Sequence, residues 1–231
     1  FQFPNAENFA GFDNFANAIG SKGFLAAFFN SLLISVTSVL LILLCCSMCA
    51  WFITRVNTKI TKFCYFLFVF SMVVPFQMLM FTLANLTDKT GLNTPYNLCI
   101  VYLGFGAGLA VFMFCGFMKS IPLEIEEAAM IDGCGPIRTF FKVTLPMAMP
   151  GISVATLYTF LGSMEEAQGT MLVGMAKVQT MPVAMYGIVL DSSAVQIGAV
   201  FAILLIIPSA LMIFAMRKYI GPEAISGGFK M

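Results

Sequence analysis

The chain has 231 residues, of which 60% are hydrophobic and only 10% are charged, with no histidine and a formal net charge of +1. Soluble domains carry roughly 25% charged residues, so this composition excludes an ordinary soluble protein and indicates an integral membrane protein. It also excludes a nucleic-acid-binding protein, because such proteins gather basic residues on one face.

Five stretches without Asp, Glu, Lys or Arg are long enough to cross a membrane, since a span needs about 20 apolar residues. They are residues 23–53, 63–87, 90–118, 143–164 and 192–216, each expected to lose some residues to loops. We therefore predict an all-α, polytopic membrane helix bundle with five spans.

The basic residues divide unevenly between the two ends of this bundle. One side holds Arg55, Lys59, Lys62, Lys119, Arg138, Lys142, Arg217, Lys218 and Lys230, and the other holds Lys22, Lys89 and Lys177. Cytoplasmic loops carry the excess of Lys and Arg. The C-terminus is therefore predicted to be cytoplasmic, with "TDKTG" and "GMAKVQTMP" outside.

Residues 1–22 precede the first span and are expected to form an external loop at the start of the bundle. They lack the basic flank, short apolar core and cleavage site of a signal peptide. Five spans with an internal C-terminus place Phe1 outside, so we expect an earlier span, the first of six, to be missing from this sequence. Residues 23–219 then form one transmembrane domain, and residues 220–231 a cytoplasmic tail.

Six of the seven cysteines lie within apolar runs, where they are interpreted as small buried hydrophobes. The exception is Cys134, in a polar segment. With no histidine and no Cys-x-x-Cys pair in a loop, no metal site is expected.

The segment "SIPLEIEEAAMIDGCGPIRTFFKVTLP", residues 120–146, holds four of the 11 acidic residues. Ser120 is expected to cap a helix, Pro122 to lie in its first turn, and Gly133 to permit the left-handed turn that ends it. The pattern predicts a separate helix of roughly ten residues, too short to cross the bilayer.

Two interpretations of this short helix stay open. It either lies on the membrane surface or docks on a protein partner. A surface helix is expected to present Lys and Arg to anionic lipid, whereas this one presents only acids. The charge sign therefore favours a protein partner.

The spacing within the segment resembles the EAA loop of binding-protein-dependent ABC importer permeases. Glu127-Ala128-Ala129, three residues, Gly133, nine residues and "VTLP" match that loop, with Val143 in place of isoleucine. "FFNSL", "AWFITR", "GFMKSIPLEIEEAAMIDG" and "ISGGFK" also resemble the carbohydrate-uptake branch, most closely the maltose-type permease subunit without a large external domain. The resemblance implies the type I ABC importer permease fold.

The resemblance further implies that residues 121–133 form a coupling helix that docks on a cytoplasmic ATPase subunit. The residues it assigns to coupling are Glu124, Glu126, Glu127, Ala128, Ala129, Asp132, Gly133, Leu145 and Pro146. ATP and Mg would bind to the partner ATPase dimer, and this chain would hold no cofactor and no catalytic residue. The other implied partners are a second, non-identical permease, an external solute-binding protein and the lipid of a bacterial or archaeal cytoplasmic membrane.

The tail "EAISGGFKM" has two interpretations. A frayed, solvated terminus is the default for a chain end. The resemblance instead implies that Gly227, Gly228, Phe229 and Lys230 reach between the ATPase subunits.

The spans contain no charged residue, which disfavours ion-coupled carriers and favours a neutral solute. Uncharged polar residues are candidates for the translocation path, although holding helices together is their commoner use. In the second span these are Gln77, Thr82 and Asn85, and in the fourth Ser153, Thr156, Tyr158, Thr159 and Ser163. Pro75 and Pro208 are expected to break their helices.

Glu165 and Glu166, in "GSMEEAQGT", replace a Trp-Asn pair that many relatives carry nearby. The two carboxylates either lie at the outer mouth of the path, or face the binding protein, or belong to a solvated loop edge. Trp51 is left as the only tryptophan.

Three function classes are compatible with a membrane helix bundle. A transport subunit that works with partner ATPases accounts for the short acidic helix, and a non-sugar solute remains an alternative within that class. An ion-coupled carrier or channel would need charged or carbonyl-lined sites at mid-depth. A membrane enzyme would need a nucleophile with a base, or a metal, and the sequence offers neither.

Overall fold

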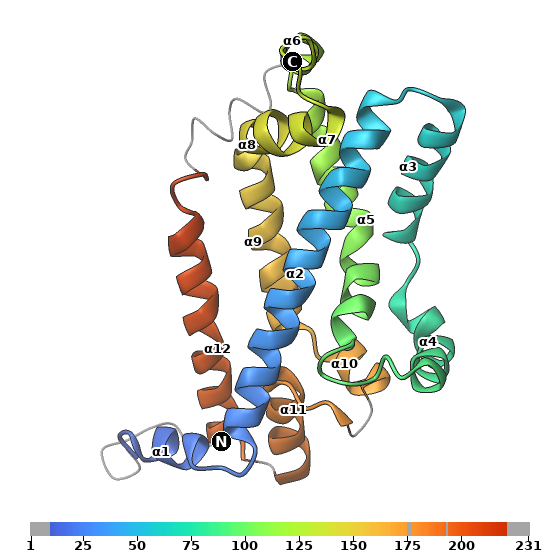
Figure 1. Ribbon diagram of the computed structural model, residues 1–231. Coiled ribbons are helices and arrows are strands. Elements are labelled where there is room, and N and C mark those ends of the chain that lie inside the picture. The colour runs from blue at the N-terminus through green and yellow to red at the C-terminus, as the bar shows by residue number, and fades with distance from the viewer. Residues whose placement is uncertain (1–9, 175–176, 193, 221–231) are drawn as a thin grey trace.

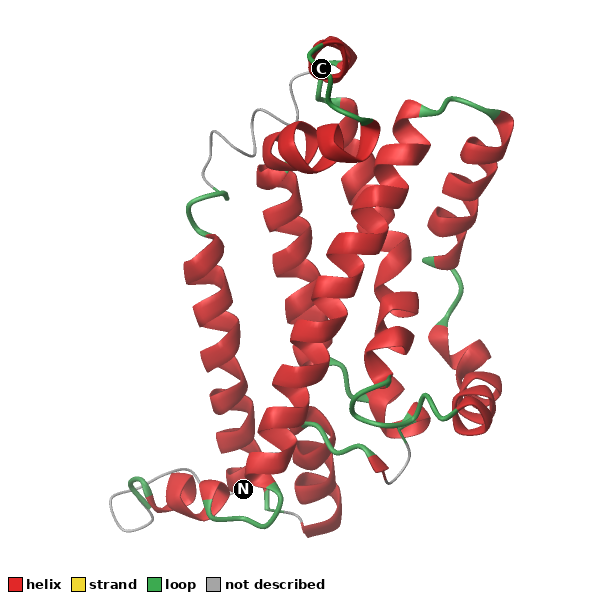
Figure 2. Cartoon of the chain, in the orientation of Figure 1, coloured by secondary structure: helices red, strands yellow, loops and turns green. Residues whose placement is uncertain are grey.

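A computed structural model describes residues 10–174, 177–192 and 194–220. Within these ranges every regular element is a helix, as Figure 2 shows. The all-α fold predicted from composition is confirmed. The elements are α1 (Asp13–Ile19), α2 (Phe24–Arg55), α3 (Lys59–Ser71), α4 (Phe76–Thr90), α5 (Leu98–Lys119), α6 (Leu123–Ile131), α7 (Pro136–Thr139), the π-helical η1 (Phe140–Thr144), α8 (Leu145–Met147), α9 (Met149–Glu165), α10 (Gln168–Val173), α11 (Met181–Ser192) and α12 (Val195–Met216).

The long helices form an elongated bundle, with α2, α5, α9 and α12 running along its length (Figure 1). In the part of the chain that the structure describes, three helices, α2, α5 and α12, are each long and apolar enough to cross a membrane. Two bent pairs, α3 with α4 and residues 136–147 with α9, bring the count to five if each pair is one span. Large apolar side chains such as Leu40, Phe66 and Ile206 are exposed on the outside, as expected where lipid is the solvent.

The second predicted span is not one continuous helix. It divides into α3 and α4, which meet at 100°. Pro75 is the residue before α4, and its ψ of 131° is extended rather than helical. Its ring also disfavours the helical conformation in the preceding residue, Val74. The predicted break at Pro75 is confirmed. The predicted break at Pro208 is wrong, because α12 continues through that residue.

The fourth span begins at Met149 rather than at residue 143. A turn at Ala148, with ψ at −3°, bends the chain by 79° before α9 starts. The "VTLP" motif therefore lies in a helical segment that crosses the end of the bundle (Figure 1). Pro150 in the first turn of α9 suits this restart, because that position needs no backbone N–H.

Two short helices lie at the end of the bundle opposite α6 (Figure 1). α1 falls within the expected external segment, and its Ala18 is buried in a cluster with Phe24 and Phe201. α11 was not expected, because its 12 residues are too few to cross a membrane.

The core of the bundle is the contact between α2 and α5. Ile42, Cys46, Val111 and Phe114 are buried there in one apolar cluster. On the other side of α5, Gly108 allows α3 to approach closely, because a β-carbon at that position would lie 2.7 Å from the carbonyl oxygen of Phe68. Small residues at such contacts let membrane helices pack backbone to backbone.

All seven cysteines are free thiols. Three of them, Cys46, Cys99 and Cys115, are buried as expected, and Cys49 and Cys64 are half-buried. The expectation is wrong for Cys45, which is exposed.

Candidate functional site

The short acidic helix predicted from the sequence is α6, nine residues at one end of the bundle (Figure 1). Its N-cap is Pro122, and no side chain caps it. The cap predicted at Ser120 is wrong, because that residue still belongs to the end of α5 and its hydroxyl donates a hydrogen bond to the Phe117 carbonyl oxygen at 2.7 Å.

The C-terminal end of α6 matches the prediction. Gly133 has φ at +87°, the left-handed region that favours glycine. The Cys134 amide then donates to the Ala129 carbonyl oxygen at 3.0 Å, which closes the helix end. The helix therefore begins and ends independently of the spans on either side.

Most of the predicted coupling residues are exposed or half-buried. Glu124, Glu127, Ala128, Asp132, Gly133 and Pro146 are exposed, and Ala129 and Leu145 are half-buried. Apolar side chains accompany the acids, above all Ile131, which is 87% exposed. We call the exposed residues of α6 together with Asp132 and Gly133 the α6 surface. Exposed apolar side chains that are surrounded by polar residues are a feature of protein interaction sites.

Glu126 is the exception among the predicted coupling residues, because it does not lie on the α6 surface. Its side chain is buried, pointing toward α2 and away from the α6 surface. The Glu126 carboxylate accepts hydrogen bonds from Arg55 Nη2 at 2.7 Å and Arg55 Nε at 3.0 Å. It also accepts from Trp51 Nε1 at 3.0 Å and Thr144 Oγ1 at 2.9 Å.

These contacts join three elements at one carboxylate: α2 through Trp51 and Arg55, α6 through Glu126 itself, and η1 through Thr144. We call this set of four residues the Glu126 joint. Burial by itself would raise the pKa of Glu126, but the hydrogen bonds from Arg55, Trp51 and Thr144 and the charge of Arg55 outweigh it. The pKa therefore lies below the ordinary value for glutamate.

The segment that carries "VTLP" has an unusual backbone. Residues 140–144 form a π-helical turn, in which the Leu145 amide donates to the Phe140 carbonyl oxygen five residues earlier. Pro146 has no N–H to continue the regular pattern, which explains why the turn widens here. The motif therefore shapes the connection between α6 and α9 and holds Thr144 beside Glu126.

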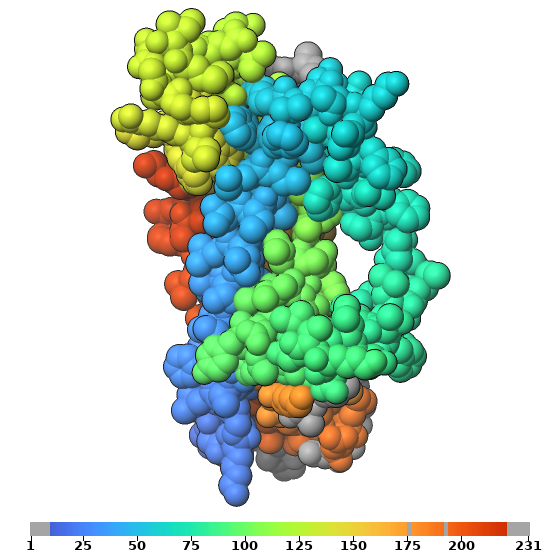
Figure 3. Space-filling view, turned by 45° about the vertical axis from the view of Figure 1, so that its right-hand side comes forward, coloured from blue at the N-terminus to red at the C-terminus, as the bar shows by residue number. Residues whose placement is uncertain are grey.

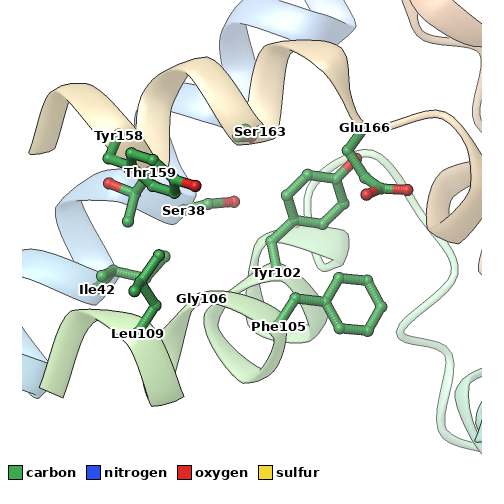
Figure 4. A pocket seen from close by; sticks show the side chains of 11 residues that line it. Ser38, Ile42, Tyr102, Phe105, Gly106, Leu109, Tyr158, Thr159, Ser163 and Glu166 are labelled. Atoms are coloured by element: carbon green, nitrogen blue, oxygen red, sulfur yellow. The ribbon is translucent and has the colours of Figure 1, made fainter. Parts of the chain in front are cut away.

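A cavity of about 210 Å³ lies between α2, α5 and α9 (Figure 4). Four of the predicted path residues, Tyr158, Thr159, Ser163 and Glu166, line it. The Ser163 hydroxyl is hydrogen-bonded to Ser35 at 2.8 Å, so it also holds α9 against α2. The commoner role of such groups is thus confirmed for Ser163.

The adjacent acids Glu165 and Glu166 face different surroundings. Glu166 lines the cavity and also a neighbouring cavity of about 340 Å³, next to α3 and α4, where Figure 3 shows the molecule hollowed. Glu165 borders a separate groove between α9, α11 and α12. Because they are adjacent in sequence, the two acids were expected to share one environment, but the structure places them beside different cavities.

The predicted path residues of the second span are not at this cavity. Gln77, Thr82 and Asn85 are exposed on α4, which follows the 100° bend, and none of the three lines the cavity. The other two predicted polar residues of the fourth span, Ser153 and Thr156, are buried. The four tail residues, 227–230, lie outside the described residues.

Several site residues were not assigned a role from the sequence. Trp51 and Arg55 occur in the quoted stretch "AWFITR", but nothing local indicates that they hold an acid 71 or more residues away. Ser38, Tyr102 and Phe105 line the cavity from α2 and α5. These three residues could not be recognised as cavity-lining from the sequence, because serine and aromatic residues are common in membrane helices.

Comparison with known proteins gives a family match over most of the chain. The family described as "Binding-protein-dependent transport system inner membrane component" matches residues 42–225.

Two curated relatives are named for carbohydrate transport. The "Probable starch degradation products transport system permease protein AmyC" of Thermoanaerobacterium thermosulfurigenes is 38% identical over 138 residues, which are 60% of this chain and 50% of that protein. The "Diacetylchitobiose uptake system permease protein NgcG" of Streptomyces coelicolor is 28% identical over 226 residues, 95% of this chain and 74% of that protein. The chain thus spans half to three quarters of the length of these relatives.

Among solved structures, a bacterial ABC transporter involved in the import of the acidic polysaccharide alginate has a chain that superimposes with a TM-score of 0.72. The match covers 92% of this chain and 84% of that chain at 18% identity, which establishes a shared fold. That fold is the one expected from the α6 motif.

Proposed function

Since this chain belongs to the family of binding-protein-dependent transport system inner membrane components, we propose that it is the permease subunit of an ATP-driven sugar importer. It forms half of the translocation path for a neutral sugar or oligosaccharide. The chain itself is non-catalytic: ATP and Mg bind to a partner ATPase dimer, and α6 docks on one of those ATPase subunits.

The observation that carries this proposal is the placement of the EAA pattern on an exposed helix at the end of the bundle. Glu127, Ala128 and Gly133 face outward, with exposed acids and aliphatic side chains around them. A basic cleft on an ATPase subunit complements this surface in charge. The small alanine side chains allow the partner backbone to approach closely.

The Glu126 joint supports a role in transmitting movement. Because one buried carboxylate ties α6 to α2 and to η1, a displacement of α6 carries these elements with it. Such rigid-body movement of helices around a central site is the usual basis of alternating access. The segment of α7, the π-helical turn and α8, followed by the bend at Ala148, connects α6 to α9, which lines the cavity.

The arrangement of basic residues supports a cytoplasmic location for α6. Arg55, Lys59 and Lys119 lie at the same end of the bundle as α6, and Lys22 and Lys89 lie at the other (Figure 1). The excess of basic residues marks the cytoplasmic side. We therefore place the C-terminal tail, including residues 227–230, in the cytoplasm at the ATPase interface, and the bundle in a bacterial or archaeal cytoplasmic membrane.

The relatives support a carbohydrate as the solute, because AmyC and NgcG are named for starch degradation products and diacetylchitobiose. Hydroxyl and aromatic side chains in the cavity suit a sugar ring, since aromatic faces stack on apolar faces and hydroxyls exchange hydrogen bonds. An external binding protein and a second, non-identical permease complete the assembly.

The test is the coupling between ATP hydrolysis and transport in the reconstituted complex. ATP hydrolysis and solute uptake are measured with and without the external binding protein, across a panel of neutral oligosaccharides. Stimulation of hydrolysis by one loaded binding protein is expected. If only a charged ligand stimulates hydrolysis, the ATP-coupled mechanism stands and the carbohydrate assignment is wrong.

Reversing the charge of Glu127 tests the docking role of α6. Glu127→Lys is expected to prevent assembly with the ATPase or to leave hydrolysis without uptake, because the α6 surface would repel a basic cleft. Asp13→Lys makes the same reversal on α1, at the opposite end, and is expected to keep the wild-type ratio of ATP hydrolysed to solute transported. Normal coupling in Glu127→Lys would contradict the docking role.

A further inference from the structure

The cavity between α2, α5 and α9 contains one charged group, Glu166, among uncharged neighbours. One carboxylate oxygen, Oε1, accepts a hydrogen bond from the Gly169 amide at 2.6 Å. Among the described residues, the two ion pairs are Arg55 with Glu126 and Asp88 with Lys177, so no described cation neutralises Glu166. Its Oε2 atom accepts no hydrogen bond from any described residue and is available to a ligand.

Ser38 gives a second, independent indication of a ligand. This α2 side chain lines the same cavity and is completely buried, yet its hydroxyl has no hydrogen-bond partner among the described residues. Figure 4 shows it between the Tyr158 and Thr159 side and the Tyr102 and Glu166 side. Three other buried hydroxyls among the described residues, those of Thr139, Ser153 and Thr180, also lack a partner, but Ser38 alone of the four lines this cavity. A buried hydroxyl without a partner is costly, so a solute group that bonds to Ser38 is stabilised there.

The size and the lining of the cavity fit one sugar ring. Its volume of about 210 Å³ is many times the roughly 10–15 Å³ that holds a single water molecule, so it has room for a larger solute. Tyr102, Phe105 and Tyr158 supply aromatic rings around it. Glu166 and Phe105 also line the neighbouring cavity, so a solute that moves from one to the other passes the carboxylate.

We propose that Glu166 determines the charge class of the saccharide that this permease accepts. Its free oxygen accepts hydrogen bonds from the hydroxyls of a neutral ring that also bonds to Ser38. A uronic acid would bring a second carboxylate close to the first, and like charges at short range repel. This inference rests on the proposed function. It adds that Glu166 is a specificity-determining residue and that the permease rejects anionic saccharides.

Direct binding of probe saccharides to the complete importer in nanodiscs, without the binding protein, tests the proposal. The probes are maltotriose, raffinose and triacetylchitotriose as neutral trisaccharides and trigalacturonate as the anionic one, measured by equilibrium dialysis. The wild type is expected to bind at least one neutral probe and to bind trigalacturonate at least about tenfold more weakly. Glu166→Gln is expected to reduce that preference to about threefold or less.

Glu165→Gln is the matched control, because it removes the same charge from the next residue but faces the groove beside α11 and α12. It is expected to keep the wild-type preference. Glu166→Asp, which retains the carboxylate, is expected to keep it as well. Ser38→Ala is expected to weaken binding of the neutral probe severalfold without lowering the unfolding temperature, since the hydroxyl that it removes has no protein partner.

Three results would overturn the proposal: equal binding of trigalacturonate and the neutral probes by the wild type, equal effects of Glu165→Gln and Glu166→Gln, or no binding of any neutral probe. The first and third are read from the wild type alone, whatever the stability of the variants. ATP hydrolysis and solute uptake by the same complex in proteoliposomes with the binding protein, including the Glu127→Lys comparison, report separately on the proposed function. Intact coupling with any of these three results would leave the importer standing and remove only the role of Glu166.

Discussion

At the scale of single residues, the Glu126 joint contains a buried ion pair between Arg55 and Glu126. The side chains of Glu126 and Arg55 are only 2% and 15% exposed. Removing one partner of a buried ion pair leaves the other charge uncompensated, which costs about 3–5 kcal/mol. We expect Glu126→Gln to lower the free energy of unfolding by about 3 kcal/mol, measured as a fall in the thermal unfolding temperature of the purified protein.

The neighbouring acid Glu124 is the control for this variant. It is exposed on the same helix, so Glu124→Gln is expected to change stability by no more than about 0.5 kcal/mol. Equal stability of the two variants would show that the joint contributes little.

The pH dependence of stability checks the same joint. The pKa of Glu126 is lowered in the folded protein, so the unfolded state binds more protons at acid pH. The contribution of the joint is therefore complete above the ordinary glutamate pKa of about 4.3 and is lost as the pH falls through the folded value. Glu126→Gln should lose less stability than the wild type over this acid range.

At the scale of elements, α5 offers two glycines with opposite expected behaviour. A β-carbon at Gly108 would lie 2.6 Å from the Ser71 hydroxyl oxygen and 2.7 Å from the Phe68 carbonyl oxygen, whereas Gly116 has open space. Gly108→Ala is expected to destabilise the protein by about 1–3 kcal/mol by pushing α3 away from α5. Thermal unfolding of the purified variants measures the effect.

Gly116→Ala makes the same substitution on the same helix and should be neutral or stabilising by up to about 1 kcal/mol, since alanine favours the helix more than glycine does. A neutral Gly108→Ala would show that α3 is free to shift.

The positions of the helices along the chain were predictable from the sequence, but the angles and contacts between helices were not. Pro122 and Gly133 were enough to place α6, because they act within a few residues of themselves. Which acid of α6 points inward was not predictable, since it depends on the angle between α6 and α2 and on Arg55, which is distant in sequence. In the same way, Pro75 indicated a break but not the 100° angle that carries Gln77 and Asn85 away from the cavity.

At the scale of the whole molecule, the bent α3–α4 pair is either one broken span or a loop that re-enters the membrane from the same side. The distribution of basic residues favours a span, with Lys59 inside and Lys89 outside. We expect Lys89→Cys to react with a membrane-impermeant maleimide in intact cells and Lys59→Cys only after permeabilisation. The substitutions are matched, because both replace an exposed lysine at one end of the pair.

The unsubstituted chain, with its own thiols, gives the background for this labelling. Labelling of both positions from the same side would establish a re-entrant loop, and the number of membrane crossings would then fall by one.

Trp51 has a consequence for experiment. It is the only tryptophan in the chain, and its indole N–H bonds to the carboxylate that holds the short acidic helix against the bundle. Indole fluorescence responds to polarity and to hydrogen bonding, so the emission of this subunit comes from one place and reports whether that helix is seated. The fluorescence of Trp51 therefore reports on the Glu126 joint without an added dye.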